Sequence, residues 1–186
     1  MTSLRPSSWR DYQMNIAQRG QVPHPKLNVF AARFSMARGL PDFDFDGLGR
    51  AASASYHIAL RIGLAYSALE SLEKAINCRN QIEIESEQIS DALRSDLFKQ
   101  FFETLLHQGD VQDGERKKLI DFSSGQSEDL RPIVYAIRNL MFHGSLTAHG
   151  LGLASSIKRR KILDDLFAEV MLATNNRFTL YVRRMR

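Results

Sequence analysis

Residues 48–77 read LGRAASASYHIALRIGLAYSALESLEKAIN and carry the longest uninterrupted helical pattern of the chain. Apolar side chains recur along it at steps of four and three, which places them on one face of a helix about 45 Å long. A helix of this length needs an equally long partner to cover its apolar face. The segment therefore predicts an all-α protein. The apolar positions are Ile58, Ile62, Ala65, Leu69, Leu72 and Ile76.

Three more segments carry a helical pattern, and together with residues 48–77 they predict an up-and-down four-helix bundle. Residues 86–108 have a broad apolar face, whose phenylalanines we interpret as core rather than as a surface for stacking bases. Residues 128–142 follow Ser127, a residue type that caps helix starts. Residues 155–182 form the last helix, and a short helical piece begins at Arg116.

Residues 1–46 lack a sustained period and contain four of the five prolines. We expect an extended arm with short helices near residues 11–19 and 28–38, held down by Trp9, Phe30 and Phe34, and a helical domain over residues 47–186. Asp42, Asp44 and Asp46 alternate as in a calcium loop, but the later acidic ligand is missing. These carboxylates are therefore expected to support the start of the following helix.

Bulk composition narrows the class of protein. Of 186 residues, 44% are hydrophobic and 25% are charged, which is typical of a globular chain. No apolar run approaches the roughly 18 residues of a membrane span, and no signal-peptide core is present, so a cytoplasmic protein without membrane contact is expected. The single cysteine, Cys78, excludes an internal disulfide and a cysteine-based zinc site.

Positive charge is concentrated near the C-terminal end. Residues 150–186 hold eight Lys/Arg against three Asp/Glu, whereas residues 47–149 hold eleven against fourteen. The run Lys158-Arg159-Arg160-Lys161 lies in the first turns of the predicted last helix. This distribution favours an anionic partner near that end, although a solvated basic face is the commoner reason for such a run.

The stretch IRNLMFHG, residues 137–144, groups polar side chains at the end of a buried helix. Gly144 provides a helix stop, which places His143 at or near the cap. Asn139 and His143 are four positions apart and share one face. Arg138 offers a planar cation that matches phosphate, and His143 offers a proton donor or acceptor near neutral pH. Such a pair suits phosphodiester chemistry, and it equally suits a structural role at a helix C-terminus.

This stretch resembles the signature of the HEPN superfamily, which is an arginine, a polar residue, several others and then a histidine. Arg138, Asn139 and His143 fill these positions. The resemblance implies a metal-independent endoribonuclease without a cofactor, which acts as a homodimer because the motifs of two protomers meet. It further implies a toxin or phage-defence effector with an antitoxin partner. Ser145 stands where one toxin branch has a tyrosine that its antitoxin modifies, which argues against that form of control.

Further residues are expected to act together with this motif. Lys158, Arg159, Arg160 and the loop residue His149 are predicted to bind RNA phosphates. His143 and His149 lack the acidic or thiol ligands that would complete a metal site. Two alternatives stay open: a non-catalytic helical dimer that binds a nucleotide, RNA or protein at the motif, and a regulator whose basic tail binds nucleic acid. An acidic residue facing the motif, Glu70 or Glu73, is a further possibility that the spacing does not select.

Overall fold

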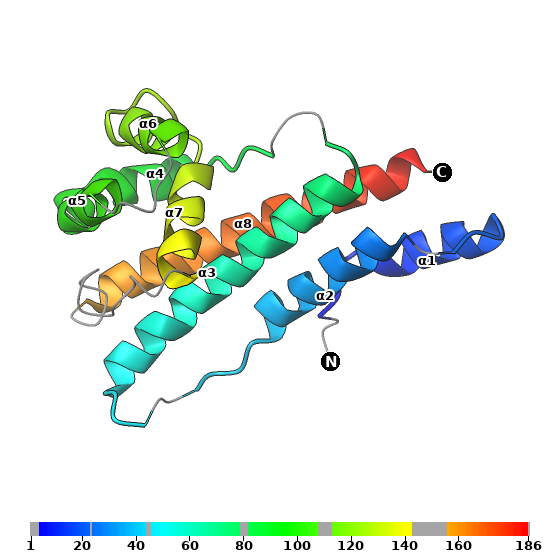
Figure 1. The fold of residues 1–186 in the computed structure, drawn as a ribbon, viewed down its shortest axis with the longest axis horizontal. Coiled ribbons are helices and arrows are strands. Elements are labelled where there is room, and N and C mark those ends of the chain that lie inside the picture. Colours follow the sequence, from blue (N-terminus) through cyan, green and yellow to red (C-terminus); the bar gives the residue numbers. More distant parts are fainter. Residues whose placement is uncertain are drawn as a thin grey trace. The chain divides into compact units, whose positions relative to one another are not determined.

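The all-α prediction is confirmed by a computed structural model, which describes residues 4–22, 24–43, 46–78, 82–107, 113–142 and 156–185. Within these ranges the chain forms eight α-helices, one short 3₁₀ helix and no strand (Figure 1). The only β-type pairing among them is an isolated bridge between Glu85 and Asp129. The up-and-down order of a four-helix bundle stays a prediction. The helices are α1 (Trp9–Gln18), α2 (Pro25–Gly39), α3 (Arg50–Ala75), α4 (Glu87–Arg94), η1 (Asp96–Phe98), α5 (Lys99–His107), α6 (Asp113–Ser123), α7 (Arg131–Phe142) and α8 (Ile157–Arg184).

The chain divides into two compact units, and both long helices contribute to each. The first unit contains residues 1–40, 64–82 and 170–186. The second unit contains residues 41–63 and 83–169. The division at residue 46 expected from the sequence stays a prediction, but residues 1–40 do belong to a unit that also includes parts of α3 and α8.

Aromatic side chains form the core of the first unit. Phe178 of α8 lies at its centre, with ring centroids 5.8 Å from Trp9, 6.0 Å from Tyr12 and 5.2 Å from Phe30. Phe30 in turn lies edge-on to Phe34 at 5.9 Å. All five side chains are buried. The two short helices expected before residue 46 are therefore present as α1 and α2, and their apolar anchors are part of a core.

The helix α3 begins and ends close to the limits that the sequence predicts. The carbonyl of Gly49 accepts hydrogen bonds from the amides of Ala52 and Ser53 at its start. At its end Asn77 takes a left-handed backbone conformation with φ 47°, and the amide of Cys78 bonds back to the carbonyl of Glu73. Asparagine tolerates this conformation at a helix C-terminus better than most residues do. Within the predicted apolar stripe, Ile62, Ala65, Leu69 and Leu72 are fully buried.

The prediction of one continuous helix over residues 86–108 is wrong, because this segment forms three shorter helices, α4, η1 and α5. Ser95 interrupts it with an extended backbone at φ −66° and ψ 158°, and its hydroxyl donates to the carbonyl of Ala92. Serine competes with helical hydrogen bonding in this manner. The break lets Leu93 and Phe98 be fully buried on either side of it, and Phe101 is 1% exposed. The interpretation of the phenylalanines as core is confirmed.

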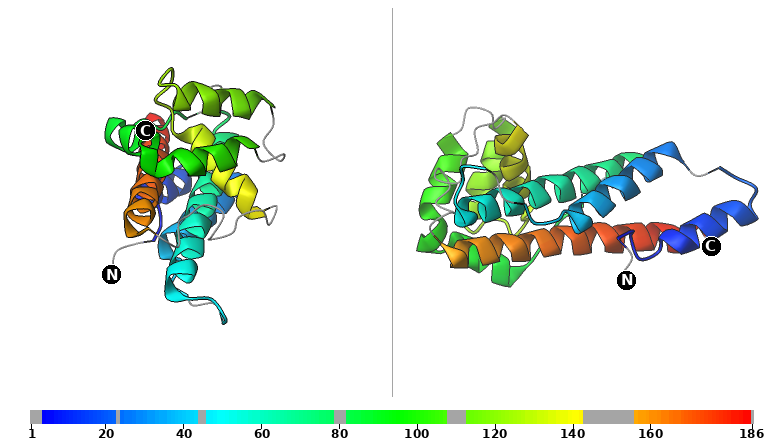
Figure 2. Two further views of the ribbon diagram at one scale, coloured as in Figure 1. Left: turned by 90° about the vertical axis from the view of Figure 1, so that its left-hand side faces the viewer. Right: turned by 90° about the horizontal axis from the view of Figure 1, so that it is seen from below.

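Arg94 ties α4 to the turn between α6 and α7. Its guanidinium donates to the carbonyls of Phe122 and Ser127 at 3.0 and 2.7 Å, and to the Glu128 carboxylate at 3.0 Å. It also lies over the Phe122 ring, with 4.7 Å to the centroid. Figures 1 and 2 show α4, α5 and α6 grouped around α7 in the second unit.

The helix α7 starts three residues later than the sequence predicts. The Asp129 carboxylate accepts hydrogen bonds from the amides of Ile84 and Arg131, while the Ser127 hydroxyl accepts from the amide of Asp129. The aspartate therefore serves the helix start, and Ser127 serves the turn before it. Pro132 lies in the first turn of α7. The first helical residue of α8 is Ile157, and the Ser156 hydroxyl caps this helix by accepting from the amide of Arg159 at 3.2 Å.

Candidate functional site

Arg138 and Asn139 lie in the last turns of α7 and are bonded to each other. Arg138 Nη1 donates to Asn139 Oδ1 at 2.9 Å. Asn139 is 3% exposed, and Arg138 is half-buried. A buried amide that accepts from a guanidinium restricts the orientation of that guanidinium, because both partners lose their alternatives in water. Asn139 thus contacts Arg138, and the predicted bond from Asn139 to His143 lies outside the described residues.

The remaining motif residues lie outside the described residues. His143 and Gly144 follow the end of α7, and His149 belongs to the same segment, residues 143–155. The catalytic role of His143, the phosphate contact of His149 and the closeness of Lys158–Lys161 to the motif therefore stay predictions.

The four consecutive cationic residues of α8, Lys158 to Lys161, have different environments. Lys158 is exposed. Arg159 is half-buried, and its Nε donates to the carbonyl of Leu97 at 2.7 Å. Arg160 and Lys161 line a cleft. The residues of the run predicted to bind phosphates therefore differ in their contacts. Arg159 binds the backbone of Leu97, whereas Arg160 lines a cleft that a ligand can enter.

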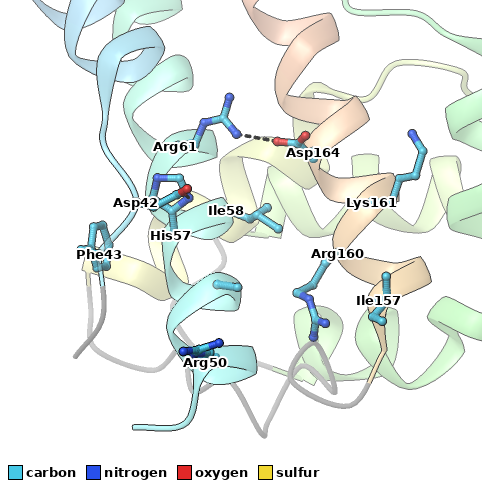
Figure 3. A pocket seen from close by; sticks show the side chains of 11 residues that line it. Asp42, Phe43, Arg50, His57, Ile58, Arg61, Ile157, Arg160, Lys161 and Asp164 are labelled. Atoms are coloured by element: carbon cyan, nitrogen blue, oxygen red, sulfur yellow. Dashed lines mark hydrogen bonds and ion pairs between the residues drawn. The ribbon is translucent and has the colours of Figure 1, made fainter. Parts of the chain in front are cut away.

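This cleft has a volume of about 620 Å³ and lies between the first turns of α3 and α8 (Figure 3). Each helix contributes one face to it, at helical spacing, and Asp42 and Phe43 complete its wall. We call it the Arg50/Arg160 cleft. Its lining consists of Asp42, Phe43, Arg50, Ala54, His57, Ile58 and Arg61, and of Ile157, Arg160, Lys161 and Asp164.

Ion pairs fix one end of the Arg50/Arg160 cleft. Arg61 Nη1 contacts Asp164 Oδ1 at 2.5 Å, and its guanidinium lies 3.9 Å from the centroid of the Phe167 ring. Lys161 Nζ lies 2.9 Å from both oxygens of Asp165, and this hydrogen bond raises the pKa of the lysine above its ordinary value. Arg61 and Lys161 are thus held in place as part of the wall.

His57 is the buried ionisable side chain of the cleft. It is 8% exposed, and its Nδ1 lies 3.3 Å from Asp42 Oδ1. The Phe43 ring meets the imidazole edge-on, with centroids 5.3 Å apart. Asp42 therefore contacts a histidine on α3, which adds to the role at the helix start that the sequence predicts. A carboxylate beside one ring nitrogen helps to orient the imidazole.

The role of Glu70 or Glu73 as an acidic partner of the motif stays a prediction. Glu73 Oε1 accepts from the amide of Ile82 at 2.7 Å, which supports the segment after α3. Glu70 is half-buried. No group of three His, Cys, Asp or Glu side chains arranged for a metal ion occurs in the described ranges. No described helix is both long and apolar enough to cross a membrane.

Comparison with known proteins adds no relative. No family model matches this chain, and neither a curated protein nor a solved structure matches it. The site is therefore defined by its own geometry.

Sequence reasoning missed Arg50, His57 and Arg61. These residues are seven and four positions apart, a spacing that puts them on one face of α3, and this signal was available. It was overlooked because the apolar stripe of the same helix is more regular.

Proposed function

We propose that the chain is a metal-independent endoribonuclease of HEPN type that cleaves RNA at Arg138, Asn139 and His143. The observation that carries the proposal is the hydrogen bond between Arg138 and Asn139 in the last turns of α7. It presents an oriented guanidinium five positions before His143 in the sequence. An oriented cation supports phosphoryl chemistry because it is already in place when negative charge develops.

In the proposed reaction the ribose 2′-hydroxyl attacks the adjacent phosphorus. A bond forms between the 2′-oxygen and phosphorus, and the bond from phosphorus to the 5′-oxygen breaks, which leaves a 2′,3′-cyclic phosphate and a 5′-hydroxyl. His143 takes the proton of the attacking hydroxyl, and His143 of the partner subunit gives a proton to the leaving oxygen. Such proton transfers contribute typically about 10²–10⁴-fold.

The two other motif residues have separate tasks in this proposal. Arg138 binds the non-bridging oxygens and stabilises the extra charge of the transition state. The Asn139 carbonyl oxygen positions Arg138, while its amide nitrogen is a donor suited to His143, four positions further on. RNA is the substrate because DNA lacks the attacking hydroxyl, and the expected setting is a toxin or phage-defence effector with an antitoxin.

A second candidate function is a non-catalytic helical module that binds a phosphate-bearing partner. The half-burial of Arg138 and its bond to a buried amide favour it, since the same geometry serves a purely structural arginine. The two functions differ in whether His143 is needed for bond cleavage.

The test compares wild-type protein with His143→Ala on mixed RNA in EDTA, with analysis of the 3′-ends. His107→Ala is the matched control, because His107 is an exposed histidine at the end of α5. Cleavage by wild type and His107→Ala, but not by His143→Ala, with cyclic phosphate ends, is expected. Absence of cleavage by folded, dimeric wild type would favour the binding module, and equal cleavage by all three would overturn the assignment of the site.

A further inference from the structure

We infer that the Arg50/Arg160 cleft is a binding site for a free mononucleotide. The inference does not depend on the proposed nuclease, because it uses none of Arg138, Asn139 and His143. Its basis is the charge, size and shape of a described cavity in the second unit.

The charge of the cleft selects an anion. Its lining holds four cations, Arg50, Arg61, Arg160 and Lys161, against the carboxylates of Asp42 and Asp164. The carboxylate of Asp165, outside the lining, pairs with Lys161, which leaves a surplus of one positive charge. Figure 3 shows that Arg61 meets Asp164 at one end, whereas Arg50 and Arg160 lie toward the other. The surplus is therefore concentrated at the end where the two helices begin.

The backbone reinforces this charge. Arg50 is the first residue of α3 and Ile157 is the first of α8, and both line the cleft. Helix N-termini carry partial positive charge, and here the first residue of each of two helices lines one cavity together with two guanidinium groups. Guanidinium groups match phosphate oxygens in pairs of parallel hydrogen bonds. A phosphate monoester is the ligand group that fits this end.

The rest of the cleft fits a nucleoside. A volume of about 620 Å³ exceeds what phosphate alone needs and lies within the range of small-molecule sites. The Phe43 ring, held edge-on against His57, and the apolar side chain of Ile58 supply a surface for a flat base. Asp42 and His57 supply hydrogen-bonding groups for ribose hydroxyls or base amines.

The same carboxylates argue against a longer polyanion. The Asp42 side chain is 99% exposed beside the cleft, so a continuing RNA backbone would pass a full negative charge there. A polyanion gains affinity from uniformly positive tracks. A mixed lining, in which cations stand beside the carboxylates of Asp42 and Asp164, matches a ligand with one charged end.

The experiment titrates the full-length protein with adenosine 5′-monophosphate and monitors binding by calorimetry. Adenosine, inorganic phosphate and a short single-stranded RNA are titrated in parallel. Binding of the monophosphate is expected, with adenosine at least about tenfold weaker, because the loss of a charge-assisted contact costs that much or more. Equal binding of adenosine and the monophosphate, or binding of the RNA alone, would overturn the inference.

Variants locate the site. Arg50→Gln and Arg160→Gln should each weaken binding of the monophosphate about tenfold or more, whereas Lys117→Gln, an equal charge change at an exposed position of α6, should not. Arg50 is exposed, so its variant stays informative even if Arg160→Gln fails to fold. Unchanged affinity in folded Arg50→Gln and Arg160→Gln would contradict the inference. Loss of RNA cleavage in His143→Ala would leave this result unaffected, which separates the two proposals.

Discussion

The two compact units differ in what they bury. Tyrosines aside, the buried polar side chains of the described first unit are the hydroxyls of Ser71 and Thr174. Besides the hydroxyls of Ser53, Ser55 and Ser90, the second unit buries the side chains of His57, Arg131 and Asn139. Burying an ionisable or amide group is costly unless it is paired. The first unit thus has the composition of a scaffold, and the second carries the polar groups that a functional site requires.

The largest expected effect is on the stability of the first unit, which should depend strongly on the aromatic side chain of Phe178. Replacing Phe178 with alanine removes the ring that three others contact, and the free energy of unfolding should fall by about 3–5 kcal/mol. Denaturant titration followed by the fluorescence of Trp9, the only tryptophan, measures this loss. Leu172→Ala, at a position 52% exposed on the same helix, should change stability by less than about 0.5 kcal/mol. Similar losses in both variants would show that the aromatic core is not the source of stability.

The stability of the second unit should depend on a polar contact, the one made by Arg94. In Arg94→Met the carbonyls of Phe122 and Ser127 lose their charged donor, and stability should fall by about 1–3 kcal/mol. The control is Lys99→Met, a similar change at an exposed position of α5. Thermal unfolding followed by circular dichroism makes the comparison, and a loss no larger in Arg94→Met than in Lys99→Met would argue against the role of Arg94.

The smallest expected effect is on the stability of the protein at acidic pH. The hydrogen bond from Arg94 holds the pKa of Glu128 below its ordinary value. Because the folded pKa is the lower one, the contribution of this carboxylate is present at neutral pH and is lost as pH falls through the folded pKa. NMR titration of Glu128 should show its pKa rising in Arg94→Met. An unchanged pKa would mean that Arg94 does not stabilise the charged carboxylate.

The sequence predicts the helices better than it predicts what interrupts them. The apolar period of α3 and the left-handed Asn77 at its end follow from local rules. The break at Ser95 does not, because the side chains on both sides of it keep an apolar face in helical register, and only packing selects the extended backbone. The start of α7 was misplaced for a similar reason: Asp129 also accepts from Ile84, a contact 45 positions distant that no local pattern reveals.

The candidate site was predictable in part. The motif predicts a role for Arg138 and Asn139 that stays a prediction, and it does not predict their mutual hydrogen bond, since neighbouring residues on a helix do not ordinarily face each other. Arg160 was identified from a run of cations, whereas Arg159, its neighbour, proved to bind the carbonyl of Leu97. Spacing alone does not reveal which cation in a run is turned toward the protein.

The interleaving of the two units has a consequence for dissecting this protein. The first unit is assembled from three separate stretches of chain and the second from two, so no single cut yields either one intact. A fragment that lacks residues 1–40 would retain Phe178 without its partners Trp9, Tyr12 and Phe30. Study of either unit alone therefore requires its stretches to be joined by new linkers or recombined as separate fragments.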